Sequence, residues 1–332
     1  MFVAPGVRWV TRPARKVARA EWSEFGFLGS RSVARQRRGV RVLPLHRAVR
    51  MMAPSQNSGN VRKVAEDMLY VSEPNPMYFG NPSNENMSSN PRWTNANWLK
   101  SRFHFSFAEY MSRSNSNFGV LRVMNDDLVQ PARGFGSHPH RNMEICTFVV
   151  DGELTHQDSM GTAETLGPNS IQFMTAGTGV VHAERNMSPE EPLRFIQMWI
   201  VPRRSGLEPN YGSMRGDKCN WAPNTWQHLV SDVERKDAAT PVQINQDANV
   251  FVAQVESGCS VPLRIEDDRQ AYFLQVRGSV AIQNTASAAS AVLKQHEAAE
   301  LEGALDLSVV AQGEDGALCL VVEMSRDGSS RF

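Results

Sequence analysis

Two pairs of metal-binding residue types constrain the fold of this chain most strongly. His138 and His140 stand near the start of a Gly-rich stretch, residues 134–186, and His182 and Glu184 stand near its end. On a β-strand, residues i and i+2 point to the same face, so the members of each pair project together. Two such strands placed side by side in a barrel would bring three imidazoles and one carboxylate to one point. These groups are ligands for a divalent transition metal.

From Trp98 onward, short apolar segments rich in β-branched residues alternate with turn residues. Asp151-Gly152 is a strong hairpin signal, and Asn125–Asp127 is expected to form a turn. Helical periodicity is almost absent, so the pattern predicts an all-β fold of the barrel or jelly-roll type. The segments expected as strands in the first half are 103–107, 120–124, 144–150, 154–157, 170–174, 179–184 and 193–201.

A second run of predicted strands resembles a repeat of the first. Arg277-Gly278 stands where the hairpin signal stood in the first half. The positions that match the first histidine pair are Arg264 and Glu266, so the second barrel is expected to lack a metal. The predicted regions are a metal-binding barrel at 98–205, an inter-domain crossing at 206–227 and a second barrel at 228–325.

Residues 1–55 form a basic extension, with twelve Arg or Lys against two Glu in the first fifty residues. This composition is typical of an organellar transit peptide. The alternatives are a disordered or untranslated segment, with the start at Met51 or Met52, and a nuclear patch at Arg35–Arg38. The expected location is therefore the cytoplasm, or a mitochondrion or plastid if the extension is a transit peptide, with the nucleus as a further option. Residues 56–97 are rich in Asn, Ser and Pro and are expected to be a linker, with a short helix around Val61–Leu69.

The rest of the composition excludes several classes of protein. The whole chain has no net charge, and its first fifty residues are strongly basic. The part after residue 50 is therefore mildly acidic and lacks the basic surface that is typical of nucleic-acid binding. No run approaches the length of about eighteen apolar residues that spans a bilayer. The four cysteines form no CxxC, which argues against a disulfide framework and for a reducing compartment. Two fused barrels already bury what a one-barrel chain hides by dimerising, so a monomer is expected.

The residues alone leave the fourth ligand open. Glu144 lies four residues after His140, so a continuous strand would place it on the same face, where it could replace Glu184 or hold a ligand imidazole. A structural metal site is usually closed by four ligands and most often contains Cys. No thiolate is present among these ligands, which favours a catalytic metal with open positions. His104, His228 and His296 are expected to be structural.

Three motifs carry a resemblance to a known family. They are Gly-x-His-Pro-His-x-x-x-Glu at 136–144, Gly-x-x-x-His-x-Asp-Ser-x-Gly at 152–161 and Gln-x-Met-x-Ala-Gly-x-Gly-x-x-His-x-Glu at 172–184. They resemble the pirins, members of the cupin superfamily, and especially the bacterial pirins with quercetinase activity. The resemblance covers about residues 95–325 and implies two tandem cupin barrels.

For the metal, the resemblance implies the ligands His138, His140, His182 and Glu184, with Glu144 beside them. The implied cofactor is one divalent transition metal, with Fe(II) first and copper, manganese, nickel, cobalt or zinc as alternatives.

The resemblance also implies an oxidoreductase, a quercetin 2,3-dioxygenase. A flavonol-like phenol would give up its hydroxyl proton to Glu184 or Glu144 and would be opened by dioxygen with loss of carbon monoxide. The alternative is a redox-responsive transcriptional cofactor that contains iron and binds a protein partner without turnover. The residues expected to form the substrate pocket are the walls Phe135, Ile145, Phe173 and Met174 and the hydrogen-bonding residues His156 and Gln172.

Overall fold

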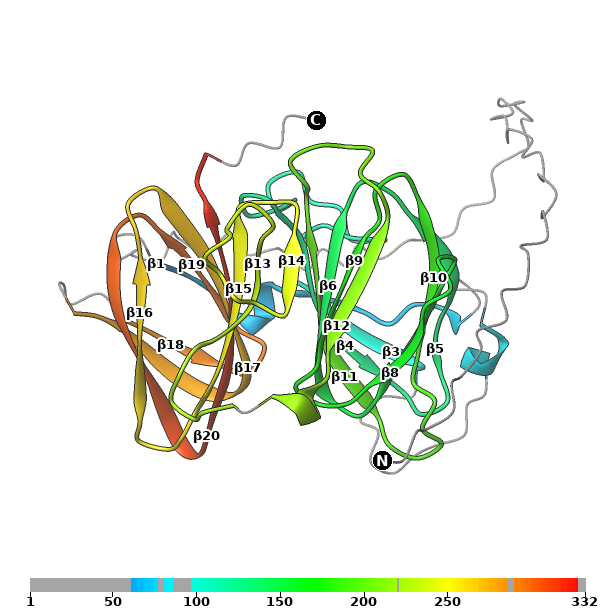
Figure 1. Ribbon diagram of the computed structural model, residues 1–332. Coiled ribbons are helices and arrows are strands. Elements are labelled where there is room, and N and C mark those ends of the chain that lie inside the picture. The colour runs from blue at the N-terminus through cyan, green and yellow to red at the C-terminus, as the bar shows by residue number, and fades with distance from the viewer. Residues whose placement is uncertain (1–60, 77–80, 86–96, 220, 286–289, 328–332) are drawn as a thin grey trace, which may run out of the picture. The chain divides into compact units, whose positions relative to one another are not determined.

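The computed structural model describes residues 61–76, 81–85, 97–219, 221–285 and 290–327, which form two β-barrels built from three sheets (Figure 1). The expectation of an all-β fold with two barrels is confirmed. The extension 1–55 lies outside the described residues. No helix among the described residues could cross a membrane. The helices there are short 3₁₀ turns: η1 (Glu66–Met68), η3 (Pro82–Glu85) and η4 (Gly216–Lys218).

The N-terminal barrel consists of a seven-stranded and a four-stranded sheet. Figure 1 shows β6 and β9 of the larger sheet on one side of this barrel and β5 and β10 of the smaller sheet on the other. The larger sheet has the order β12 (Asn210–Met214), β9 (Ile171–Thr175), β6 (Glu144–Asp151), β11 (Leu193–Ile200), β4 (Leu121–Val129), β3 (Leu99–Phe103) and β2 (Tyr70–Ser72). The smaller sheet has the order β5 (Gly134–His140), β10 (Val180–Arg185), β7 (Leu154–Asp158) and β8 (Ala163–Leu166).

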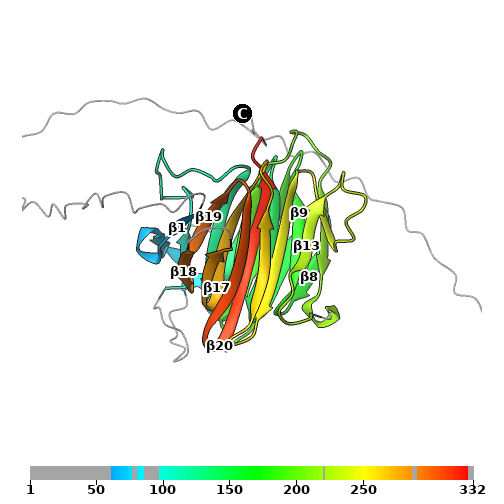
Figure 2. The ribbon, with the colours of Figure 1, turned by 90° about the vertical axis from the view of Figure 1, so that its left-hand side faces the viewer.

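The C-terminal barrel is one nine-stranded sheet. Its long strands β17 and β20 pair with each other, and Figure 2 shows them side by side along the sheet. The main path is β1 (Val61–Val64), β19 (Ala298–Glu302), β17 (Arg269–Asn284), β20 (Leu305–Ser325), β15 (Ala248–Val255), β13 (Gln227–Asp232) and β14 (Val242–Ile244). Two further strands, β16 (Ser260–Ile265) and β18 (Ser290–Lys294), pair with β20 and β17.

The segment expected as a linker contributes one strand to each barrel. In β1, Val61 pairs with Leu301 of β19, and in β2, Tyr70 pairs with Phe103 of β3. Of the short helix expected around Val61–Leu69 only the 3₁₀ turn η1 is present, because the first four residues form β1, whose end valines are buried against the C-terminal sheet. The region expected as a crossing, 206–227, likewise contains β12, which pairs with β9.

The two faces of the seven-stranded sheet have different roles. On β6, Cys146 and Phe148 share one apolar core with Tyr272 and Leu274 of the C-terminal sheet. Successive strand residues alternate in direction, so Ile145, Thr147 and Val149 of β6 point into the N-terminal barrel. The sheet therefore separates the interior of the N-terminal barrel from the core that it shares with its neighbour.

A turn follows β6 as expected, but the expected hairpin is wrong, because β7 pairs with β10 and β8 in the smaller sheet and not with β6. β6 ends at Asp151, β7 begins at Leu154, and Gly152 between them has a φ of +74°. A Cβ at Gly152 would lie 2.4 Å from the carbonyl oxygen of Pro192, so both the backbone conformation and the space require glycine.

Two expectations about β3 and β4 are wrong. The strand expected at 103–107 instead ends at Phe103. The turn expected at Asn125–Asp127 lies in the middle of β4. These polar residues have low strand propensity, but they are buried, and Asp126 is bound by Arg194 of the next strand. Tertiary partners therefore override the local preference.

Candidate metal centre

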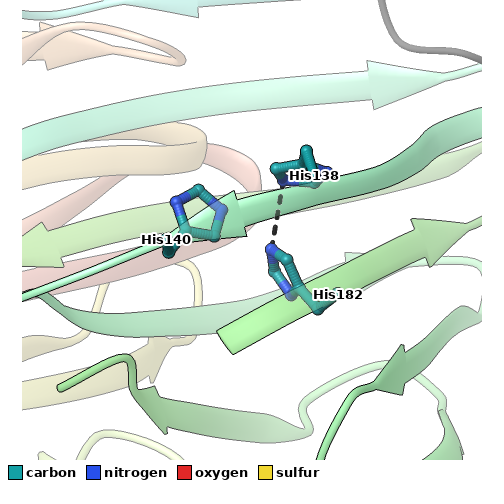
Figure 3. Close-up of side chains that lie close together, drawn as sticks. All are labelled: His138, His140 and His182. Atoms are coloured by element: carbon teal, nitrogen blue, oxygen red, sulfur yellow. Dashed lines mark hydrogen bonds between the residues drawn. The ribbon is translucent and has the colours of Figure 1, made fainter. Parts of the chain in front are cut away.

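Three histidines converge from two neighbouring strands. His138 and His140 project from β5, and His182 projects from β10, where it pairs in register with His138 (Figure 3). The Nε2 atoms of His138 and His182 lie 3.1 Å apart, and the ring centroids of His140 and His182 lie 4.7 Å apart. The three histidines each offer one ligand atom within 4.8 Å of the others. The sequence spacing therefore placed three of the four predicted ligands correctly relative to one another.

Glu184 follows His182 on β10 and lies beside the three histidines. It forms a second group with His156 and His182, again with ligand atoms within 4.8 Å of one another. His182 belongs to both groups and connects them. Glu184 is 2% exposed and accepts hydrogen bonds from Gln172 Nε2 at 3.0 Å and Gln197 Nε2 at 2.8 Å. Two neutral amides thus orient this carboxylate within the barrel.

The protonation states of the histidines suit metal binding. Burial, with His182 and His138 as neighbours, lowers the pKa of His140 to about 3. Burial also lowers the pKa of His182 far below its ordinary value, and His138 and His156 add to this shift. Both imidazoles are therefore neutral near pH 7, which is the form that ligates a metal. His138 Nδ1 donates to the carbonyl oxygen of Gly136 at 2.7 Å, and its Nε2 faces His182.

A row of polar side chains crosses the inner face of the large sheet. Asn125 of β4 pairs with Gln197 of β11, which pairs with Thr147 of β6, which pairs with Gln172 of β9. The two glutamines of this row reach Glu184 on the opposite sheet. The row therefore forms the side of the barrel interior that faces the histidines.

Glu144 does not join the candidate centre. The expectation of a shared face with His140 is wrong because the chain turns between β5 and β6, where Asn142 has a φ of +50°. Glu144 points the other way and accepts hydrogen bonds from Thr175 Oγ1 at 2.7 Å and Asn245 Nδ2 at 3.0 Å. Burial raises the pKa of Glu144, although these two bonds oppose the shift. It therefore connects the N-terminal barrel to the C-terminal barrel.

This placement predicts a difference between the two glutamates. Glu184→Gln should weaken metal binding by about 100-fold, because an anionic ligand becomes a neutral one. Glu144→Gln should change the affinity by less than about threefold, because its side chain is directed away from the histidines. Competition with a chelator measures both values. The reverse order would contradict the ligand assignment.

A cavity of about 80 Å³ opens next to the candidate centre, and its lining includes His138, His140 and Glu184. Four aromatic side chains form part of its wall. Phe107 lies edge-on to Trp199 at 5.2 Å, and Trp199 lies edge-on to His140 at 4.7 Å. The aromatic lining residues are Phe103, Phe107, Phe135 and Trp199. The cavity therefore suits an aromatic ring next to the histidines.

The residues predicted for the substrate pocket lie in different parts of the structure. Phe135 lines the cavity. Phe173 points to the opposite face of β9, into the core shared with the C-terminal barrel, because it alternates with Gln172. Met174 packs with Ile145 in a separate inner cluster, and neither is part of the described cavity lining.

His156 and Gln172 support the candidate centre instead of lining the cavity. His156 pairs in register with Glu184, stacks on Tyr211 at 4.7 Å, and its Nε2 lies 3.1 Å from Asp158 Oδ2. Burial would raise the pKa of Asp158, but hydrogen bonds from His156 and from the following turn hold it below its ordinary value. His156 is thus held between an anionic partner and an aromatic ring, and Gln172 holds Glu184.

Sequence reasoning missed the polar residues of the cavity wall, which include Asn125, Asp127 and Ser101. The only signal was the acidic run within an apolar strand, and it was interpreted as a turn. Asp127 is 3% exposed and accepts a short hydrogen bond from Ser101 Oγ. Burial raises the pKa of Asp127 to about 8, and Asp126 and Glu184 add to the shift. Its carboxyl is therefore largely protonated at neutral pH.

Asp127 should make stability depend on pH. Between pH 3.8 and about 8 the folded chain keeps a proton on Asp127 that the unfolded chain releases. Stability should therefore fall as the pH rises through this window, by at most about 1.4 kcal/mol per pH unit. Asp127→Asn should remove this contribution, and the exposed Asp267→Asn should not. Urea unfolding at several pH values measures the difference. A constant difference between wild type and Asp127→Asn would contradict the raised pKa.

Comparison with known proteins adds to this geometry. Residues 85–200 match the family described as Pirin, and residues 229–324 match the quercetinase C-terminal cupin domain. A pirin-like protein of Caulobacter vibrioides is 39% identical over 188 residues, which cover 56% of this chain and 78% of that protein. The quercetin 2,3-dioxygenase of Escherichia coli is 35% identical over 196 residues, which cover 59% of this chain and 82% of that protein.

A solved structure shows the same fold. The bacterial pirin YhhW from Escherichia coli, in complex with nickel(II), is 26% identical to this chain and superposes with a TM-score of 0.64. The match covers 80% of this chain and 99% of that protein. Both barrels of this chain are therefore of the cupin type.

Proposed function

The chain belongs to the pirin family, and from that premise we propose that it is a metal-dependent dioxygenase of the quercetin 2,3-dioxygenase type. The proposed substrate is a flavonol-like phenol, and the co-substrate is dioxygen. The observation that carries the proposal is that His138 and His140 of the histidine cluster, together with Glu184, line a cavity with four aromatic residues in its wall. The Escherichia coli relative that bears the name quercetin 2,3-dioxygenase supports it.

The residues fit a bound divalent metal. Glu184 is a buried carboxylate whose described hydrogen bonds come from neutral amides, and no described ion pair includes it. A buried anion without a cationic partner is costly, and a metal ion on Glu184 and the three histidines would remove this cost. We propose Fe(II) as the ion, since nitrogen and oxygen ligands with open positions suit it. When bound, the ion supplies Lewis acidity and the redox chemistry that dioxygen requires.

The protein side chains have separate roles in this proposal. Glu184 is the carboxylate placed to take the hydroxyl proton of the substrate, because Glu144 faces away from the cavity. Gln172 and Gln197 hold Glu184 in position. Phe107 and Trp199 provide apolar walls that orient an aromatic ring and exclude water from it.

The cavity also favours turnover over the alternative function. A redox-responsive cofactor for a transcription factor would require a surface for its partner, but no aromatic cavity beside the metal. The aromatic lining around His138 and His140 is instead what binding of a small phenol requires.

Oxygen uptake tests the proposal. The protein is purified without added metal, its metal content is measured, and a panel of flavonols is added in an oxygen electrode with carbon monoxide detection. We expect metal-dependent oxygen uptake with release of one carbon monoxide per flavonol opened. Metal-loaded protein that consumes no oxygen with any flavonol would contradict the proposal.

A further inference from the structure

We infer that Asn125 and Asp127 form a hydroxyl-binding wall in the cavity, and that the substrate is an aromatic ring with a second hydroxyl group for this wall. The inference rests on the proposed function, because it takes the first hydroxyl to be the one directed at the metal centre. It adds a substrate class and two binding residues to that function.

The wall lies across the barrel from the histidines. Asn125 and Asp127 are two residues apart on β4, so their side chains lie on the same face of the sheet. Ser101 of β3 pairs in register with Asp127, so its side chain lies on this face as well. All three line the cavity, as do His138 and His140. β4 belongs to the seven-stranded sheet and β5 to the four-stranded sheet, so the two polar groups approach the cavity from opposite sheets.

Asn125 offers an acceptor that the described residues do not use. Its side chain is 2% exposed, and its Oδ1 is buried without a hydrogen-bond partner. Most buried polar atoms in proteins have a partner, and an unpaired acceptor costs stability. A ligand hydroxyl that donates to Oδ1 would provide this partner.

Asp127 complements this acceptor. Its Oδ1 accepts from Ser101 Oγ. Burial raises its pKa to about 8, with Asp126 and Glu184 as the acidic groups that add to the shift, so its carboxyl can donate a hydrogen bond at neutral pH. A hydroxyl group both donates and accepts, so Asn125 Oδ1 and protonated Asp127 can satisfy it together.

The remaining wall encloses one ring of the flavonol-like substrate. Phe103 and Phe107 lie edge-on to each other at 5.2 Å beside Trp199, which gives the cavity aromatic sides. Its volume of about 80 Å³ is well below the range of about 300–1,000 Å³ that is typical of sites for drug-sized ligands. Single-ring phenols are therefore suitable probes for the wall.

Binding of phenol and of the three dihydroxybenzenes, measured by calorimetry without oxygen, tests the inference. In nickel-loaded wild type, the tightest dihydroxybenzene should bind about tenfold more tightly than phenol. In Asn125→Leu this preference should disappear, so that the tightest dihydroxybenzene and phenol bind with about the same affinity. The matched control Asn249→Leu makes the same change at a buried asparagine of β15 in the C-terminal barrel and should keep the preference.

Repeating the titrations on metal-free protein distinguishes the contribution of the wall to binding from the contribution of the metal. The loss caused by Asn125→Leu should remain, because the wall needs no ion. Equal binding of phenol and all dihydroxybenzenes by wild type, or no binding of any of them, would overturn the inference. Survival of the preference in Asn125→Leu would also overturn it. Absence of oxygen uptake with flavonols would contradict the proposed function and leave these binding results unchanged.

Discussion

Protein carrying His138→Ala should be purified without metal and should still be folded. His138 supplies one of the three imidazoles, and loss of one of four ligands should weaken metal binding by more than about 100-fold. Its side chain is only half-buried and belongs to none of the described apolar clusters. Metal analysis after desalting measures the occupancy, and circular dichroism measures the fold.

His228→Ala is the matched control for this experiment. His228 stacks on Phe251 and its Nε2 lies 2.9 Å from Asn249 Oδ1, within the C-terminal barrel. The control should keep the metal at the wild-type ratio. Full metal occupancy in His138→Ala would contradict the ligand assignment, and global unfolding of that variant would indicate a structural metal.

Arg194→Leu should cost about 3–5 kcal/mol of unfolding free energy, because it leaves a buried carboxylate without its cation. Arg194 donates to both oxygens of Asp126, at 2.8 and 2.7 Å, and to the carbonyl oxygen of Val276 in the C-terminal barrel. His296 Nδ1 lies 2.6 Å from the same carboxylate. Burial would raise the pKa of Asp126, but Arg194 and His296 hold it well below its usual range.

Urea unfolding measures this cost against two further variants. Arg264→Leu removes an arginine whose side chain is 70% exposed beside Glu266, and it should cost less than about 1 kcal/mol. The double change Arg194→Leu with Asp126→Leu should recover part of the loss, because no buried charge is left unpaired. A loss below about 1 kcal/mol in Arg194→Leu alone would contradict the conclusion that the contacts of Arg194 with Asp126 and with Val276 of the C-terminal barrel stabilise the fold.

The sequence predicted the histidine cluster because its geometry is local. His138 and His140 need only a strand to project together, and the paired strand places His182 opposite His138. The two-barrel fold was predictable for a similar reason. The strands are separated by turns, and a turn such as the one at Gly152 requires a glycine, which can be recognised in the sequence.

The errors arose where a side chain's direction depends on distant partners. Glu144 was expected beside His140 because sequence spacing does not show the turn at Asn142. Phe173 and Met174 differ by one position, and only the packing of the C-terminal sheet decides which of them faces the interior of the N-terminal barrel.

The polar wall and the early strands show the same limit. Asn125–Asp127 has the composition of a turn, but its partners on neighbouring strands and on the other barrel keep it extended. The Asn- and Ser-rich stretch at 56–97 was expected to be a linker, but its residues Val61 and Val64 are buried against strands more than two hundred residues away.

X-ray absorption at the metal edge tests the central claim most directly. The protein is loaded with one equivalent of nickel, and the spectrum reports the number and type of its ligands. The account predicts three imidazole nitrogens and a carboxylate oxygen, from His138, His140, His182 and Glu184, with no sulfur. A spectrum with sulfur ligands, or with fewer than three imidazoles, would contradict it.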